Sequence, residues 1–169
     1  MERQRILNVM EGVSINDLSR QVFIKRLAGL EDSSRYWPVF MTVSHVSIVN
    51  RAIGESINLL LQNRIPGIAA STASVKPDVS AGVDSIKDLI DSCESLSSIK
   101  ASPLELRTEK KYPHPWFGPL DARGWYFLAG FHMGLHRKQI QQIVLNLSND
   151  LSTPRRNTTS NGPIATSNS

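Results

Sequence analysis

His132 and His136 stand four residues apart within residues 121–149, a segment whose apolar residues recur at helical spacing. On a helix these two side chains project from one face, about one turn apart. Two neutral imidazoles buried side by side need polar partners, and a shared divalent cation would satisfy both. An HxxxH pair alone is also compatible with two core histidines bonded to other groups. The face that they share is mostly apolar and is predicted to point inward; its other members are Trp125, Leu128, Leu135, Gln139 and Ile143.

Three earlier segments also place apolar residues at helical intervals. In the first, residues 12–14 interrupt a pattern that starts near Arg3, so the sequence allows one interrupted helix or a short helix followed by a longer one. Pro38 stands where the second would begin, a position at which its missing N–H costs nothing. No segment shows a convincing strand pattern. The chain is therefore predicted to be all-α, a four-helix bundle with helices near residues 15–30, 37–63, 83–100 and 121–149.

Residues 64–81, between the second and third predicted helices, are rich in Ala, Ser and Pro and show no period. Connections of this length between bundle helices are uncommon. A bundle needs one when two consecutive helices are parallel and the chain must travel the full length of the bundle between them. This segment is therefore predicted to be a crossover.

The length of 169 residues suits one domain with its own core and a tail. From residue 152 onward Thr, Ser, Asn, Pro and Gly dominate, and too few apolar side chains remain to offset the entropy lost on ordering. We expect a helical domain at residues 1–151 and a disordered tail at residues 152–169.

The net charge of +4 is too weak to indicate a nucleic-acid-binding protein. Arg155 and Arg156 lie in the tail, where there are no acidic residues, which leaves +2 for residues 1–151. No stripe of Lys and Arg interleaves with aromatic residues, as a nucleic-acid platform would require. We therefore expect no nucleic-acid partner.

Cys93 is the single cysteine, so the chain can form neither an intrachain disulfide nor a zinc site built on cysteines. It lies on the apolar stripe of the third predicted helix, which favours a core residue over a catalytic thiol. Cysteine usage of this kind is typical of a reducing cytoplasm. No stretch approaches the roughly 18 uncharged apolar residues of a membrane span. We expect a cytoplasmic protein without a membrane partner.

The two remaining histidines lie in different settings. His45 falls about 100° from the centre of the apolar stripe of residues 37–63, where it borders the core and can reach a neighbouring helix. The alternative is a boundary histidine that bonds to a carbonyl. His114 stands in the Pro-rich stretch 112–120 with Trp116 and Phe117, and three prolines there forbid a helix. These aromatic residues either form a cavity wall or pin a stiff loop to the bundle.

These elements together resemble the DinB-like superfamily of four-helix metalloproteins, which includes the YfiT-type proteins and thiol-dependent transferases. The likeness spans residues 15–148 and rests on three features in the same order. Trp37 is followed by His45 on the second predicted helix. Residues 114–120, HPWFGPL, look like the family's HPxFGxL loop. The HxxxH pair is followed by Gln139.

The resemblance implies an up-down-down-up bundle in which His45, His132 and His136 bind one divalent metal ion, zinc or nickel. It also implies a metal-dependent transferase or hydrolase that activates a low-molecular-weight thiol or water against an electrophilic small molecule. His114 is the candidate catalytic residue, as proton donor, substrate ligand or loop anchor, and His114, Trp116 and Gln139 are candidates for substrate binding. The alternative is a non-catalytic, stress-associated metal- or ligand-binding module. We expect a homodimer in either case.

Overall fold

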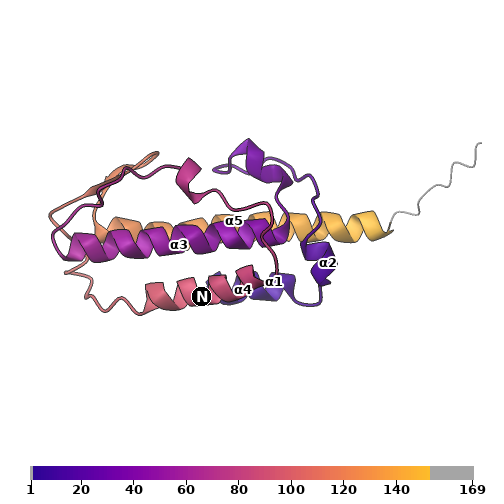
Figure 1. Ribbon diagram of the computed structural model, residues 1–169, viewed down its shortest axis with the longest axis horizontal. Helices are drawn as coiled ribbons and strands as arrows, with labels where there is room; N and C mark the ends of the chain where they lie inside the picture. The colour runs from indigo at the N-terminus through magenta and orange to yellow at the C-terminus, as the bar shows by residue number, and fades with distance from the viewer. Residues whose placement is uncertain (1, 153–169) are drawn as a thin grey trace, which may run out of the picture.

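The computed structural model of the protein describes residues 2–152, and four helices in it lie side by side (Figure 1). Short elements connect them. None of the helices within residues 2–152 is both long and apolar enough to cross a membrane. The four bundle helices are α1 (Glu2–Met10), α3 (Val39–Leu61), α4 (Asp84–Ser97) and α5 (Ala122–Ser152). The short elements are α2 (Ile15–Leu18), the 3₁₀ turns η1 (Asp32–Tyr36) and η2 (Ala73–Val75), and the strands β1 (Tyr112–His114) and β2 (Gly118–Leu120).

The bundle has the predicted up-down-down-up connectivity. α3 and α4 are parallel, because Leu89 packs in one cluster with Val46 near the start of α3 and Leu96 packs in another with Ile57 near its end. α5 runs the opposite way along α3, and α1 runs in the same direction as α5 (Figure 1). Residues 64–81 form the crossover that carries the chain back along the bundle between α3 and α4, as predicted.

The ends of the two longest helices follow from local chemistry. α3 begins at Val39, directly after Pro38 and two residues after the predicted start. It ends at Leu61, and Asn63 two residues later has a left-handed φ of 56°. Before α5, Asp121 caps the first turn: its Oδ1 accepts a hydrogen bond of 2.8 Å from the N–H of Gly124. These two helices carry every side chain of the histidine cluster described below.

The helix predicted at residues 15–30 is wrong: within that range only residues 15–18, α2, are helical, and α1 takes the first place in the bundle. The apolar residues that follow are buried in an extended segment. Val22 and Ile24 are buried while Phe23 between them is exposed, an alternation that belongs to extended chain rather than to a helix. Arg35 fixes this conformation, because its carbonyl accepts the N–H of Ile24 and its Nε donates to the carbonyl of Ile24.

The prediction that the chain lacks strands is also wrong in one place. The Pro-rich stretch forms a small antiparallel hairpin, in which Tyr112 pairs with Leu120 and His114 with Gly118. Pro113 and Pro119 face each other in the hairpin. A missing N–H is tolerated there because both strands of a two-stranded sheet are edge strands. Gly118 adopts a φ of 69°, which allows the tight return of the chain. The hairpin packs over the start of α5.

The boundary of the tail was predicted at residue 152. Ser152 is the last residue of α5, and the expectation of disorder for residues 153–169 lies outside the described residues.

Candidate metal centre

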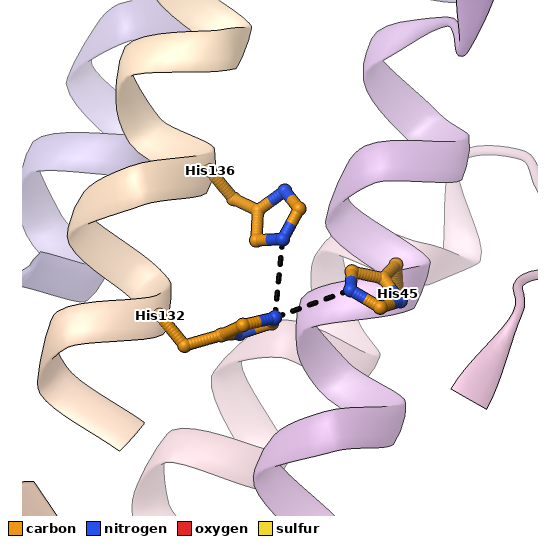
Figure 2. Close-up of side chains that lie close together, drawn as sticks. All are labelled: His45, His132 and His136. Carbon is orange, nitrogen blue, oxygen red and sulfur yellow. Dashed lines mark hydrogen bonds between the residues drawn. The ribbon is translucent and has the colours of Figure 1, made fainter. Parts of the chain in front are cut away.

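Three histidines from two antiparallel helices point toward one another (Figure 2). His45 comes from α3, and His132 and His136 come from successive turns of α5. The Nε2 atom of His132 lies 3.2 Å from Nε2 of His45 and 3.1 Å from Nε2 of His136. One ring nitrogen of each histidine lies within 4.8 Å of those of the other two. The predicted triad is therefore assembled, and these three residues could hold a metal ion.

The outer nitrogens of two of these rings are fixed by hydrogen bonds. Nδ1 of His45 donates to the carbonyl of Val75, 2.8 Å away in the crossover. Nδ1 of His136 donates to Oε1 of Gln139 at 2.7 Å, and the amide of Gln139 in turn donates to the carbonyl of Ser34 at 2.8 Å. Because a neutral imidazole carries only one N–H, both rings turn the lone pair of Nε2 toward His132.

His132 lies between these two lone pairs, and its own Nδ1 is buried without a hydrogen-bond partner among the described residues. Without a cation, the ring must place its proton on Nε2 to separate the two lone pairs, which leaves the buried Nδ1 unsatisfied. It can donate to only one of them well. The cluster therefore has more acceptors than donors at its centre, a deficit that a bound cation removes.

Burial keeps the cluster uncharged. It lowers the pKa of His136 from the usual 6.5 to about 3, and the neighbouring His45 lowers it further while the bond to Gln139 opposes the shift. Burial also lowers the pKa of His132 well below its usual value, with additional repulsion from His136, His45 and His114. For His45 burial lowers the pKa, against the opposing effects of Val75 and Glu31. All three rings are thus neutral near pH 7, the state in which imidazole binds metals.

The donor set fits a divalent cation of the zinc type. Two imidazole nitrogens that share a tetrahedral zinc at about 2.0–2.1 Å lie about 3.3 Å from each other. The two Nε2 separations in the cluster, 3.2 and 3.1 Å, are close to this value. Hydrogen bonds from the non-ligating nitrogens to a carbonyl and a side-chain amide are the outer contacts that metal-binding histidines commonly make.

The triad lies at the wall of a cavity of about 720 Å³. This volume is in the range of sites that enclose small molecules. The cavity is lined by residues of α3, α5, the crossover and the hairpin. The two helices form one side of it, and the non-helical segments cover it. Aromatic residues contribute much of its wall: Trp37, Tyr112, Trp116, Phe117, Trp125 and Phe131.

His114 also lines this cavity but is not part of the triad. Its Nδ1 accepts a hydrogen bond of 3.1 Å from the backbone N–H of Trp116, and its ring centroid lies 5.5 Å from that of Trp125 and 5.0 Å from that of Phe117. Burial lowers the pKa of His114. Trp116 itself is 57% exposed at the cavity edge. Both residues thus lie on the cavity wall that the sequence suggested.

Gln139 is fully buried and does not line the cavity. Both ends of its amide are used, one by His136 and the other by Ser34, so its contacts support a role in orienting His136 rather than in touching a substrate. Sequence reasoning missed the carbonyls of Val75 and Ser34, because any residue type can present a carbonyl and no side-chain signal marks them.

Comparisons with known proteins give a relative for the fold only. No protein-family description and no curated protein sequence matches the chain. Among solved structures the chain is similar to one described as "Crystal structure of TT2238, a four-helix bundle protein", with 19% sequence identity and a TM-score of 0.50 over 83% of this chain and 89% of that one. At this identity the likeness shows a four-helix-bundle fold.

Proposed function

We propose that this chain binds one divalent cation, zinc or nickel, through His45, His132 and His136, and that it is a metal-dependent transferase or hydrolase of the DinB-like superfamily. The observation that carries the proposal is the convergence of three imidazole nitrogens, with the tautomers of two of the three rings fixed by hydrogen bonds from outside the cluster. Val75 and Gln139 orient two of the rings before any cation binds, which lowers the cost of assembling the site.

The open side of the triad supports a catalytic role over a structural one. Structural zinc sites use four protein ligands, whereas three protein ligands leave a position for water or substrate. When bound, the cation would supply Lewis acidity and lower the pKa of a coordinated thiol or water. The cavity of about 720 Å³ on that side would admit such a molecule.

His114 would contribute a hydrogen-bond donor on the cavity wall, outside the triad. Its neutral ring carries its proton on Nε2, because Nδ1 accepts the N–H of Trp116. A donor at this place would hold an acceptor atom of the electrophile, or stabilise negative charge that develops on a leaving group. Trp116 and Phe117 would exclude water from the bound reactants.

The proposed reactants are a low-molecular-weight thiol and an electrophilic small molecule, with hydrolysis by water as the related reaction. The test combines elemental analysis of the purified protein with a screen of thiols against electrophiles. We expect about one zinc or nickel per chain, and thiol consumption that requires the metal. The His132→Ala variant should lose both, because two histidines alone bind these metals far more weakly.

The outcomes separate the proposal from its alternatives. Full metal content without turnover of any pair would favour a non-catalytic metal-binding module. Absence of stoichiometric metal from the wild-type protein, including after incubation with zinc or nickel, would overturn the proposal.

A further inference from the structure

We propose that the cavity beside the triad takes a ligand with an uncharged, largely aromatic body and a hydrogen-bond acceptor, and that His114 Nε2 donates to this acceptor. This inference rests on the proposed function in treating the cavity as the place where the electrophile binds. It adds the chemical class of that molecule, which neither the triad nor the fold indicates.

The apolar character of the wall is the first support. Trp37 and Trp125 are buried behind the cavity, whereas Trp116, Phe117 and Phe131 are more than half exposed at its edge. Large aromatic side chains that remain exposed around a concave site mark a place where an apolar partner is missing. The rings of Phe117 and Phe131 meet edge to face at 6.5 Å, so they form a continuous rim.

The charge distribution is the second support. Of the described residues that line the cavity, Glu31, Glu55 and Lys76 carry a formal charge, and all three are exposed. Their sum is negative, and no Arg among the lining residues offers the paired donors with which proteins recognise carboxylate or phosphate groups. Apart from a cation at the triad, Lys76 is the one positive group among the described lining residues, and the two carboxylates of Glu31 and Glu55 outweigh it for an anionic ligand.

The hydrogen-bonding state of His114 is the third support. The acceptor capacity of its Nδ1 is used by the N–H of Trp116, and its Nε2 has no hydrogen-bond partner among residues 2–152. An unpartnered donor on the wall of an apolar cavity discriminates strongly between ligands that carry an acceptor and ligands that do not, because a ligand without an acceptor leaves the donor unsatisfied. Phe117 and Trp125 hold the ring from two sides and limit its rotation.

The experiment uses fluorescence of N-phenyl-1-naphthylamine, which is uncharged, and of its 8-sulfonate, which has the same rings and a negative charge. Both are titrated into the full chain as purified and into the His132→Ala variant. We expect the uncharged probe to bind at least about fivefold more tightly than the sulfonate to the His132→Ala variant, in which the cation is absent. The Phe117→Ala variant should bind the uncharged probe several-fold more weakly, since it loses one aromatic side of the rim.

Phe127 provides the matched control. It is 64% exposed on α5 but does not line the cavity, so the Phe127→Ala variant should bind the probe as the wild type does. Equal losses in Phe117→Ala and Phe127→Ala would show non-specific surface binding, and equal binding of the two probes to the His132→Ala variant would show that charge is not excluded. Either result overturns the inference.

The role of His114 is tested by displacing the probe with 2-acetylnaphthalene, which has a carbonyl acceptor, and with 2-isopropylnaphthalene, which has a similar shape but no acceptor. The preference of the wild type for the acetyl compound should fall by about three- to tenfold in the His114→Ala variant, the effect of one net hydrogen bond. An unchanged ratio would overturn this assignment. Because the readout is binding, the aromatic site can be found without metal, or metal without the aromatic site, and the two proposals fail separately.

Discussion

The Nδ1 of His136 donates to Oε1 of Gln139 across 2.7 Å, one turn further along α5. Gln139 is held in turn by its amide, which donates to the carbonyl of Ser34 in η1. The chain Ser34–Gln139–His136 therefore ties a loop of the N-terminal half to a candidate metal ligand and fixes its tautomer. All three residues are buried, so removal of Gln139 leaves Nδ1 of His136 and the carbonyl of Ser34 without these partners.

Replacement of Gln139 by Ala should weaken metal binding by about 10–100-fold without removing a ligand, because the ring of His136 loses its outer support. It should also lower the free energy of unfolding of the metal-free protein by about 1–3 kcal/mol. Metal competition titrations and urea unfolding measure the two effects. Gln141→Ala is the control, since this glutamine is exposed and contacts only Arg137 among the bonds observed. Equal effects of the two substitutions would contradict the positioning role.

His136 and His114 should give opposite results when each is replaced by Ala. The His136→Ala variant should lose most of its bound metal, because it removes one of the three proposed ligands. The His114→Ala variant should retain it, because this ring lines the cavity but lies outside the triad. Elemental analysis of both variants after the same purification decides the matter. Retention of metal by His136→Ala, with loss in His114→Ala, would move the site toward the hairpin.

The stability of the metal-free protein should depend on pH in a direction set by the histidines. An unfolded histidine takes up a proton as pH falls below about 6.5. Burial lowers the pKa of His136 to about 3 in the folded chain and that of His132 well below 6.5. Between pH 6.5 and about pH 3 the unfolded state therefore binds more protons than the folded state. The stability contributed by the neutral rings is full above pH 6.5 and is lost as pH falls from 6.5 toward 3.

Urea unfolding at pH 7.5 and pH 5.5 measures this loss, which should be about 1.4 kcal/mol over the whole interval for each fully buried ring. The His136→Leu variant lacks one titrating ring and should lose less stability over the same interval. Metal affinity should fall over the same range, because the ligands must be neutral to bind. A wild-type stability that rises toward pH 5.5 would contradict the neutral cluster.

Much of the candidate site could be predicted from the sequence because residue type and helical spacing are enough to identify its histidines. The HxxxH spacing is a local property of one helix, and α5 runs as a single helix from Ala122 to Ser152. His45 could be placed at the core boundary by the same periodicity. The two carbonyls that complete the site, from Val75 and Ser34, lie in segments without periodicity, where backbone direction is set by contacts distant in sequence.

The first segment was misassigned because helical and extended packing can bury the same apolar residues. Leu18, Val22 and Ile24 fit a helical stripe in the sequence, and all three are buried in the structure. Leu18 reaches the core from the short helix α2, whereas Val22 and Ile24 do so from an extended chain that is stabilised by the non-local backbone bond of Ile24 to Arg35. Short helices are weakly encoded on their own, and tertiary packing overrode the helical periodicity of this segment.

The place of α1 in the bundle leads to a prediction that compares two isoleucines. Ile6 of α1 is fully buried in the cluster that also contains Ile140 and Ile143 of α5, whereas Ile15 at the start of α2 is 61% exposed. If α1 is a bundle helix, Ile6→Ala should lower the free energy of unfolding by about 2–5 kcal/mol, because it removes buried methylene groups and leaves a cavity between two helices.

Ile15→Ala should change that free energy by no more than about 0.5 kcal/mol, because the side chain buries little surface. Both substitutions remove the same atoms, so differences in chemistry and in the unfolded state largely cancel. Urea unfolding monitored by circular dichroism gives both values. A larger loss for Ile15→Ala than for Ile6→Ala would instead support the helix at residues 15–30 that the periodicity of the sequence favoured.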